Sequence, residues 1–153
     1  MRVSVAIFPR VRWTSGVDEN SATPKGLAVK LGFTAGQVVQ EIGYDTDTDD
    51  AVSEAIQSVG ELVNEDYGDV VDAVLLWWRE DDGDLVDALV DALGPLADHG
   101  VIWLMTPKVG RAGYVEPSDI ADAAPTAGLQ VTSAISAAAD WQGTRLVAPK
   151  ARR

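Results

Sequence analysis

The chain has 153 residues, with no cysteine, one histidine and a formal net charge of −12. The lack of cysteine excludes disulfides, thiolate metal sites and cysteine nucleophiles, and a single histidine excludes a multi-histidine metal site. Between residues 13 and 149 six basic residues stand against 24 acidic ones, a balance of 6 − 24 = −18, which repels a phosphate backbone and argues against nucleic-acid binding.

The chain begins with MRVSVAIFPRVRW, a short apolar patch that Pro9 and Arg10 interrupt. Such a patch makes a poor export signal, and no apolar run approaches the roughly 20 residues that cross a bilayer. We expect a flexible arm over residues 1–20, a single α/β domain over 21–149 and a basic tail over 150–153. The expected location is cytoplasmic, with no membrane contact.

The first predicted helix is TPKGLAVKLG. Thr23 is a suitable N-cap, Pro24 suits the first helical position, and Gly32 can take the left-handed conformation that closes a helix. The next segment, QVVQEIG (37–43), is typical of a strand because apolar and polar side chains mix along it.

The stretch GYDTDTDD (43–50) raises the question of a calcium loop. Counted from Asp45, the acids fit the early positions of an EF-hand loop. However, Asp50 stands where that loop needs glycine, and Ile56 stands where it needs glutamate. We therefore interpret the stretch as the acidic start of a helix rather than as a metal site.

That helix is predicted over TDDAVSEAIQSVG (48–60), with Asp47 or Thr48 as its N-cap and two further acids facing the positive end of the helix dipole. Its apolar face repeats at helical spacing and consists of Val52, Ala55, Ile56 and Val59. Residues 61–71 are ambiguous and fit a short edge piece.

The second half alternates strands and helices. DAVLLWW (72–78) is a continuous apolar run, typical of a strand covered on both faces, with Trp77 and Trp78 on opposite faces. DLVDALVDALGPLA (84–97) predicts a helix that Asp82 or Asp84 caps, with His99 near its end interacting with the helix dipole. GVIWLMTP is a second buried strand, over residues 100–107.

The last elements are a short helix and a hairpin. EPSDIADAAPTAG predicts a helix that Pro125 breaks and Gly128 closes. LQVTSAISAA and GTRLVAP predict two strands joined around Asp140, Trp141 and Gly143. The order of elements predicts an α/β fold: a twisted, mostly parallel, Rossmann-like sheet that ends in an antiparallel hairpin.

The chain from Asp72 onward resembles the second half of a class I S-adenosylmethionine-dependent methyltransferase, and AGQVVQEIG is similar to the first strand of such enzymes. The resemblance implies a methyltransferase-like sheet. It also implies a first loop with several glycines that let the backbone approach the cofactor, yet this chain has a single glycine there, Gly43. The units that hold the ribose-binding acid in those enzymes look shortened or missing.

A resemblance covers nearly the whole chain. SATPKGLAVKLGFTAGQVVQEIGYD, DAVLLWWREDDGDLVDALVDAL and GVIWLMTPKVGRAGYVEPSDIADAAPTAGLQVTS resemble an actinobacterial family of unknown function, DUF3052. This resemblance implies a small cytoplasmic protein and brings no activity with it.

The basic residues of the acidic body suggest a ligand site. Arg79, Lys108 and Arg111 directly follow two predicted strands, whose carboxyl ends should meet at one edge of the sheet. Together they could bind a small anion, or they could pair with nearby acids, namely Glu80, Asp81, Asp82 or Glu116. The other candidate ligand-binding residues at this edge are Gly43, Tyr44, Asp45, Trp78 and Thr106.

Three functions remain open. With no nucleophile elbow and one histidine, no catalytic set is evident, so the first is a non-catalytic binding or regulatory protein on a degenerate methyltransferase-like scaffold. The second is a binding protein or enzyme for a small anionic metabolite at the basic edge. The third is a subunit or partner of a larger complex, docked through the acidic helix face of Asp84, Asp87 and Asp91. No metal and no cofactor is expected, and S-adenosylmethionine stays an alternative.

Overall fold

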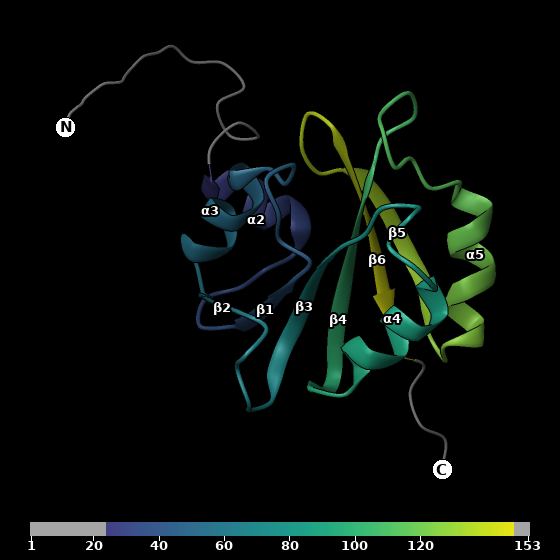
Figure 1. The fold of residues 1–153 in the computed structure, drawn as a ribbon. Helices are drawn as coiled ribbons and strands as arrows, with labels where there is room; N and C mark the ends of the chain where they lie inside the picture. Colours follow the sequence, from purple (N-terminus) through teal and green to yellow (C-terminus); the bar gives the residue numbers. More distant parts are fainter. Residues whose placement is uncertain (1–23, 149–153) are drawn as a thin grey trace.

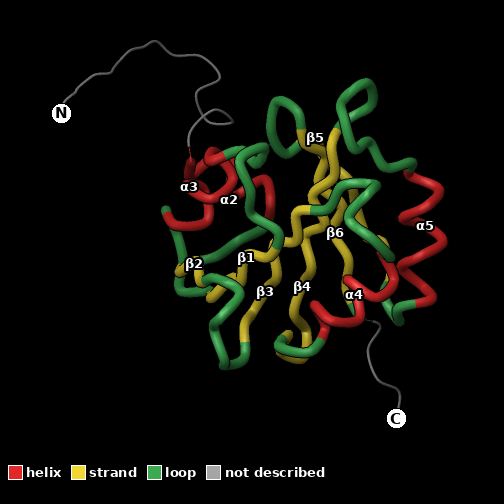
Figure 2. The backbone as a smooth tube through the Cα atoms, viewed as in Figure 1, coloured by secondary structure: helices red, strands yellow, loops and turns green. Residues whose placement is uncertain are grey.

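The computed structural model describes residues 24–148, which form one six-stranded sheet with helices on both faces (Figures 1 and 2). The strand order is β2-β1-β3-β4-β6-β5. Four strands run parallel: β1 (Val38–Ile42), β2 (Glu61–Val63), β3 (Val71–Trp77) and β4 (Leu96–Pro107). Strand β6 (Trp141–Val147) runs antiparallel between β4 and β5 (Gln130–Ser136). The predicted fold class, including the terminal hairpin, is confirmed.

Two hydrophobic cores lie on the two faces of this sheet. Helices α2 (Pro24–Leu31) and α3 (Asp50–Gln57) cover one face, and α4 (Leu85–Leu93) and α5 (Pro117–Thr126) cover the other (Figure 1). Successive side chains of a strand point to opposite faces. Accordingly, Leu75 and Trp77 of β3 enter the first core, whereas Leu76 and Trp78 enter the second. This double burial explains why the β3 sequence is continuously apolar.

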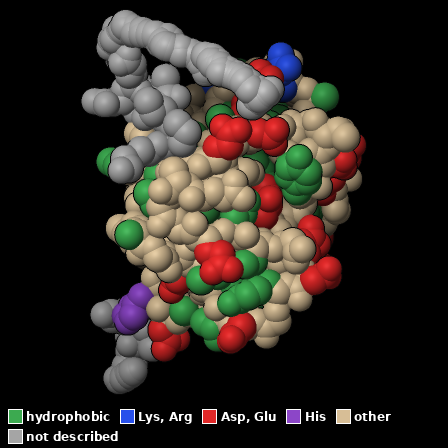
Figure 3. All heavy atoms as spheres, turned by 90° about the vertical axis from the view of Figure 1, so that its left-hand side faces the viewer, with side chains coloured by type: hydrophobic (Ala, Val, Ile, Leu, Met, Phe, Trp, Pro, Cys, Tyr) green, Lys and Arg blue, Asp and Glu red, His purple; other side chains and the backbone are tan. Residues whose placement is uncertain are grey.

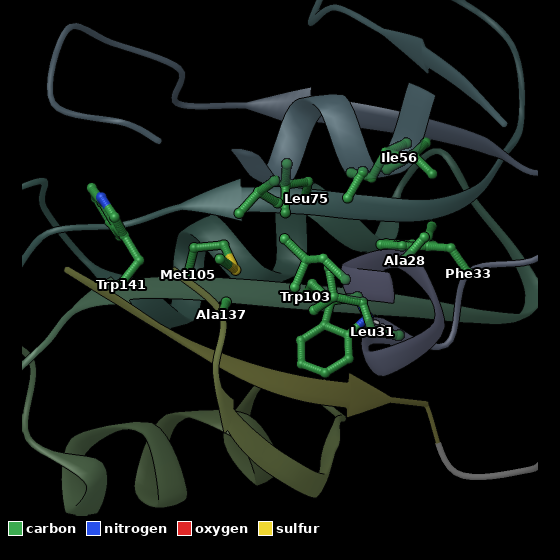
Figure 4. Close-up of a cluster of buried hydrophobic side chains, with 14 of the residues drawn as sticks. Ala28, Leu31, Phe33, Ile56, Leu75, Trp103, Met105, Ala137 and Trp141 are labelled. Carbon is green, nitrogen blue, oxygen red and sulfur yellow. Dashed lines mark hydrogen bonds between the residues drawn. The ribbon is translucent and has the colours of Figure 1, made fainter. Parts of the chain in front are cut away.

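The first core is organised around a buried tryptophan of β4. Trp103 is 2% exposed, and its indole Nε1 donates a hydrogen bond of 3.0 Å to the carbonyl oxygen of Leu31 at the end of α2. Figure 4 shows Trp103 among side chains of the sheet and of the helical layer, with Trp141 at the far end of the same cluster. The hydrogen bond satisfies the one polar group of the ring, so a large residue can fill the core without an unpaired donor.

A short crossover without a helix joins β2 to β3. It occupies residues 64–70 and passes from one side of β1 to the other. Gln40 of β1 is 4% exposed, and its amide nitrogen donates to the carbonyl oxygens of Asn64 and Tyr67 at 3.1 and 3.3 Å. The buried amide of Gln40 thus donates hydrogen bonds to carbonyl groups of the crossover. In a helical crossover, backbone N–H groups would have bonded such carbonyls. The sequence indicates a unit that is shortened relative to methyltransferases, and this crossover without a helix is such a unit.

Several predicted boundaries are wrong. Helix α4 ends at Leu93 instead of residue 97, because Gly94 and Pro95 stop it and β4 begins at Leu96. His99 therefore lies within β4, at a register irregularity and with φ +69°, and not at a helix end. Pro125 lies inside the last turn of α5, which continues to Thr126, so it does not break the helix. It lacks the backbone N–H of an ordinary helical residue, but the helical bonding continues past it, since the N–H of Ala127 donates to the carbonyl oxygen of Ala123 at 3.0 Å.

Other expectations are confirmed or lie outside the described part of the chain. Gly32 and Gly128 close α2 and α5 with φ of +83° and +86°, and residues 61–63 form the edge strand β2. The cap at Thr23, the arm over residues 1–20 and the tail over 150–153 fall outside the described residues. Among the helices of residues 24–148, none combines the length and apolar character needed to cross a bilayer.

Gly43 at the end of β1 is required by a close approach of β3. Its φ is +84°, and a Cβ atom there would collide with the carbonyl oxygen of Trp77. Gly36 has nearly the same φ, +83°, but a Cβ atom there would meet no heavy atom within 4 Å. The two glycines share the left-handed conformation, and only Gly43 has an atom where a Cβ would stand. They therefore form a matched pair for a test of that collision.

We predict that Gly43→Ala destabilises the protein by about 3 kcal/mol, because left-handed strain and a backbone collision add. Gly36→Ala should cost about 1 kcal/mol from the strain alone. Urea unfolding followed by tryptophan fluorescence measures both free energies. Equal losses for the two variants would show that β3 does not constrain Gly43.

Candidate functional site

The carboxyl ends of β1, β3 and β4 lie at one edge of the sheet. Strands β3 and β4 are adjacent and parallel, with Trp77 opposite Met105. The prediction that the carboxyl ends of these two strands meet at one edge of the sheet is therefore confirmed. From β1 the chain first adds β2 on one side and then β3 on the other. The crevice between β1 and β3 is therefore a topological switch point, the place where open α/β sheets bind ligands.

The side chain of Arg79 fills this crevice. It is 12% exposed, and its Nε and Nη2 donate to the two carboxylate oxygens of Asp47 at 3.0 and 2.5 Å. Its Nη1 donates to the carbonyl oxygen of Gly43 at 3.0 Å and contacts that of Trp77 at 3.3 Å. Asp82 is a weaker partner, 3.4 Å from Nη1. The guanidinium thereby joins the loop after β1 to the loop after β3.

Two further segments cover the guanidinium. The ring centroid of Trp141, the first residue of β6, lies 5.3 Å from the central guanidinium carbon of Arg79, a cation–π distance. The indole Nε1 of Trp141 donates to the carbonyl oxygen of Asp47 at 3.1 Å. A Cβ atom on Gly113 would stand 2.9 Å from the Cβ of Arg79. Gly113 thus allows the 107–117 segment to pass close to the stem of the Arg79 side chain.

The ion pair shifts the pKa of both partners. The hydrogen bonds from Arg79 hold the pKa of the Asp47 carboxyl below its ordinary value, against a smaller opposing effect of burial. The same hydrogen bonds raise the pKa of the Arg79 guanidinium, again against burial. Both groups are therefore charged at neutral pH, and the pair is intact there.

The acids of residues 43–50 have separate structural roles. Asp49 is the N-cap of α3 and accepts from the backbone N–H of Ala51 at 2.9 Å, so the predicted cap at Asp47 or Thr48 is wrong by one or two residues. Asp47 does not cap the helix because its carboxylate pairs with Arg79. Asp45 accepts from the backbone N–H of Thr46 at 2.7 Å. Within residues 24–148 no group of three or more acidic or histidine side chains is placed to hold a metal ion.

The acids after β3 also have structural partners. Asp84 is the N-cap of α4, where it accepts from the backbone N–H of Val86 at 2.9 Å, as one of the two predicted caps. Asp82 accepts from the backbone N–H of Arg79 at 2.9 Å. The predicted role of Asp84 as a helix cap is confirmed by these contacts.

Each of the three basic residues has a partner of its own within the protein, which is Asp47 for Arg79. Lys108 donates to the hydroxyl of Ser136, and Arg111 pairs with Asp140 at 3.2 Å between two half-exposed side chains. Arg79 continues the face of Trp77, in the first core, whereas Lys108 continues the face of Leu104, in the second. The strand alternation therefore separates two cations that follow adjacent strands. Of the predicted acidic partners Asp82 is found, and sequence reasoning missed Asp47 and Asp140.

A pocket of about 440 Å³ lies on the Lys108 side of the edge. Two predicted site residues, Thr106 and Lys108, line it. The other lining residues come from the 107–117 segment, α5 and the hairpin: Pro107, Val109, Tyr114, Val115, Pro117, Ile120, Ala121, Val131, Gln142 and Thr144. Sequence reasoning missed these residues. Gln142 of β6 stands opposite Thr106 of β4, so it could have been found by predicting how β6 pairs with β4.

The remaining predicted residues are spread around the edge. Trp78 is 8% exposed and lines a second hollow of about 430 Å³ with Glu80, Asp84 and Val115. Tyr44 is 58% exposed and projects from the loop after β1. Gly43 is bonded on both sides, since its N–H donates to the carboxylate of Glu65 at 2.9 Å. A ligand-binding role stays a prediction for all eight residues, namely Gly43, Tyr44, Asp45, Trp78, Arg79, Thr106, Lys108 and Arg111.

Sequence comparison identifies relatives over most of the chain. A family model described as protein of unknown function (DUF3052) matches residues 28–150. An uncharacterized protein of Mycobacterium tuberculosis (strain H37Rv) is 55% identical over 127 residues, which are 82% of this chain and 80% of that protein. An uncharacterized protein of Mycobacterium bovis shows the same identity and coverage.

Similar solved structures are methyltransferases. A ribosomal protein L11 methylase from Lactobacillus delbrueckii subsp. bulgaricus has a TM-score of 0.52 at 12% identity, over 84% of this chain and 79% of that one. A SAM-dependent methyltransferase from Aquifex aeolicus has a TM-score of 0.51 at 11% identity, over 80% and 88%. At such identities the likeness establishes a methyltransferase-like fold and nothing about activity.

We predict that Asp47→Asn lowers the free energy of unfolding by about 1 kcal/mol at pH 7, a modest value because the half-exposed carboxylate is screened by solvent. A carboxyl with a depressed pKa in the folded state stabilises the protein above its unfolded pKa and loses that effect as pH falls through the folded value. The difference between wild type and variant should therefore shrink below about pH 4. Urea unfolding at pH 7, 5 and 3 measures it.

Asp45→Asn is the matched control, since it removes the same charge from the same loop without touching Arg79. Its effect should be smaller than that of Asp47→Asn at pH 7. A difference between wild type and Asp47→Asn that stays constant down to pH 2 would contradict the ion pair as the cause.

Proposed function

The chain belongs to the DUF3052 family, and from its methyltransferase-like fold we propose that it is a non-catalytic binding protein on a shortened scaffold of that kind. The observation that carries the proposal is Arg79, whose side chain occupies the crevice between β1 and β3 with hydrogen bonds to Asp47 and Gly43. A bound cofactor in that crevice would have to displace a hydrogen-bonded, largely buried charge.

The residues of this crevice do not fit S-adenosylmethionine. The single glycine of the loop, Gly43, has both backbone polar groups bonded within the protein, to Glu65 and to Arg79. Its lack of a side chain serves the contact with Trp77. The crossover of residues 64–70 carries no helix. No step of methyl transfer is therefore assigned to this chain, and its own side chains supply no evident acid, base or nucleophile set.

The surface charge supports a small molecule or a protein as the bound partner rather than a nucleic acid. Figure 3 shows the β2 side of the molecule, where acidic side chains are spread over the face and basic ones are few. This distribution repels phosphate backbones. Docking of a protein partner on Asp87 and Asp91 of α4 stays a prediction, in which Asp84 takes no direct part because it caps the helix.

We predict that isothermal calorimetry of the full chain with S-adenosylmethionine shows no binding up to about 1 mM, because the crevice is filled. A SAM-dependent methyltransferase titrated under the same conditions is the positive control. Micromolar binding together with transfer of a labelled methyl group would refute the proposed function.

A further inference from the structure

The pocket beside α5 is a second feature of the carboxyl edge, independent of the filled crevice. Its floor is the sheet, where Thr106 of β4 stands opposite Gln142 of β6 and Thr144 follows on the same face. Its opposite wall is apolar and includes Val115 and Ile120. A volume of about 440 Å³ and a mainly apolar lining with a few polar groups are typical of small-molecule sites.

Two buried hydroxyls on the floor have no partner among the described residues. Thr106 and Thr144 are 2% and 5% exposed. Over residues 24–148 no group is within hydrogen-bond geometry of either hydroxyl. Buried polar groups in proteins are bonded almost without exception. The two hydroxyls on the floor of the pocket are therefore available to bond water or the oxygen atoms of a bound molecule.

Lys108 is the one charged residue among the described residues that line the pocket. Its ammonium donates to the hydroxyl of Ser136, which lies outside the lining. Within the described residues no carboxylate lies within 4.0 Å of that ammonium, whereas Arg79 and Arg111 each pair with an aspartate. In a body with an 18-charge excess of acid, a lysine without an acidic partner is available to an anionic ligand.

We propose that this pocket binds a small amphipathic carboxylate. The apolar body of the ligand packs against Val115 and Ile120, its carboxylate faces Lys108, and the hydroxyls of Thr106 and Thr144 donate to its oxygen atoms. One ammonium matches one negative charge, which favours a carboxylate over a phosphate. The inference rests on the proposed binding function and names the class of ligand.

The test is a protein-detected NMR titration of the full chain with 3-phenylpropionate, with octanoate, and with the neutral 3-phenylpropan-1-ol. Both acids should bind and shift the signals of pocket residues, and the alcohol should bind about fivefold more weakly than the aromatic acid. Lys108→Met keeps the aliphatic stem and should abolish this preference. Arg145→Met removes the same charge outside the pocket and should leave it unchanged.

Thr106→Val tests the hydroxyl. The substitution keeps the shape of the side chain, so it should weaken 3-phenylpropionate about fivefold without lowering the thermal midpoint. The proposal would be overturned if no probe binds below about 10 mM. It would also be overturned if the shifted signals lie away from the pocket, or if both pocket variants bind as the wild type does. Binding of S-adenosylmethionine would refute the proposed function alone, because the crevice and the pocket share no residue.

Discussion

The ion pair between the largely buried Arg79 and the half-exposed Asp47 is the interaction that joins the loops at the carboxyl edge of this sheet. A guanidinium carries five donors and a permanent charge, so it can leave water only where acceptors surround it. Here the acceptors come from the loop after β1 and from the end of β3, and the ring of Trp141 covers the charge. Loops distant in the sequence are thereby held in one arrangement.

That arrangement connects the fold to the proposed lack of methyl transfer. The sheet order and the antiparallel hairpin keep the methyltransferase-like architecture, while the switch point contains a side chain of the protein itself. The unit between β2 and β3 is reduced to a crossover that Gln40 holds by its amide. Shortening the scaffold and filling its crevice act in the same direction, since both remove room and polar groups that a cofactor would use.

The two sides of the same edge differ in chemistry because strand side chains alternate. On the side of the first core, the polar groups find partners within the protein, and the crevice is occupied. On the side of the second core, and within residues 24–148, the hydroxyls of Thr106 and Thr144 have no partner and Lys108 has no acidic one. The hydrogen bonds of Arg79 occupy the crevice on the side of the first core. The α5 side is therefore the part of the edge with room for a ligand.

The sequence by itself determined the order and type of the elements, because apolar periodicity, helix caps and glycine positions act over a few residues. It also determined that β3 and β4 are buried, adjacent and parallel, since alternating strands and helices allow few topologies. The tertiary structure alone decided the long-range acid that each arginine of the carboxyl edge meets, Asp47 for Arg79 and Asp140 for Arg111. Asp47 and Arg79 are 32 residues apart, and their contact depends on how two loops fold back over one strand end. Charge pairing of this kind has no signature in local sequence, because it is set by geometry that emerges after the sheet has formed.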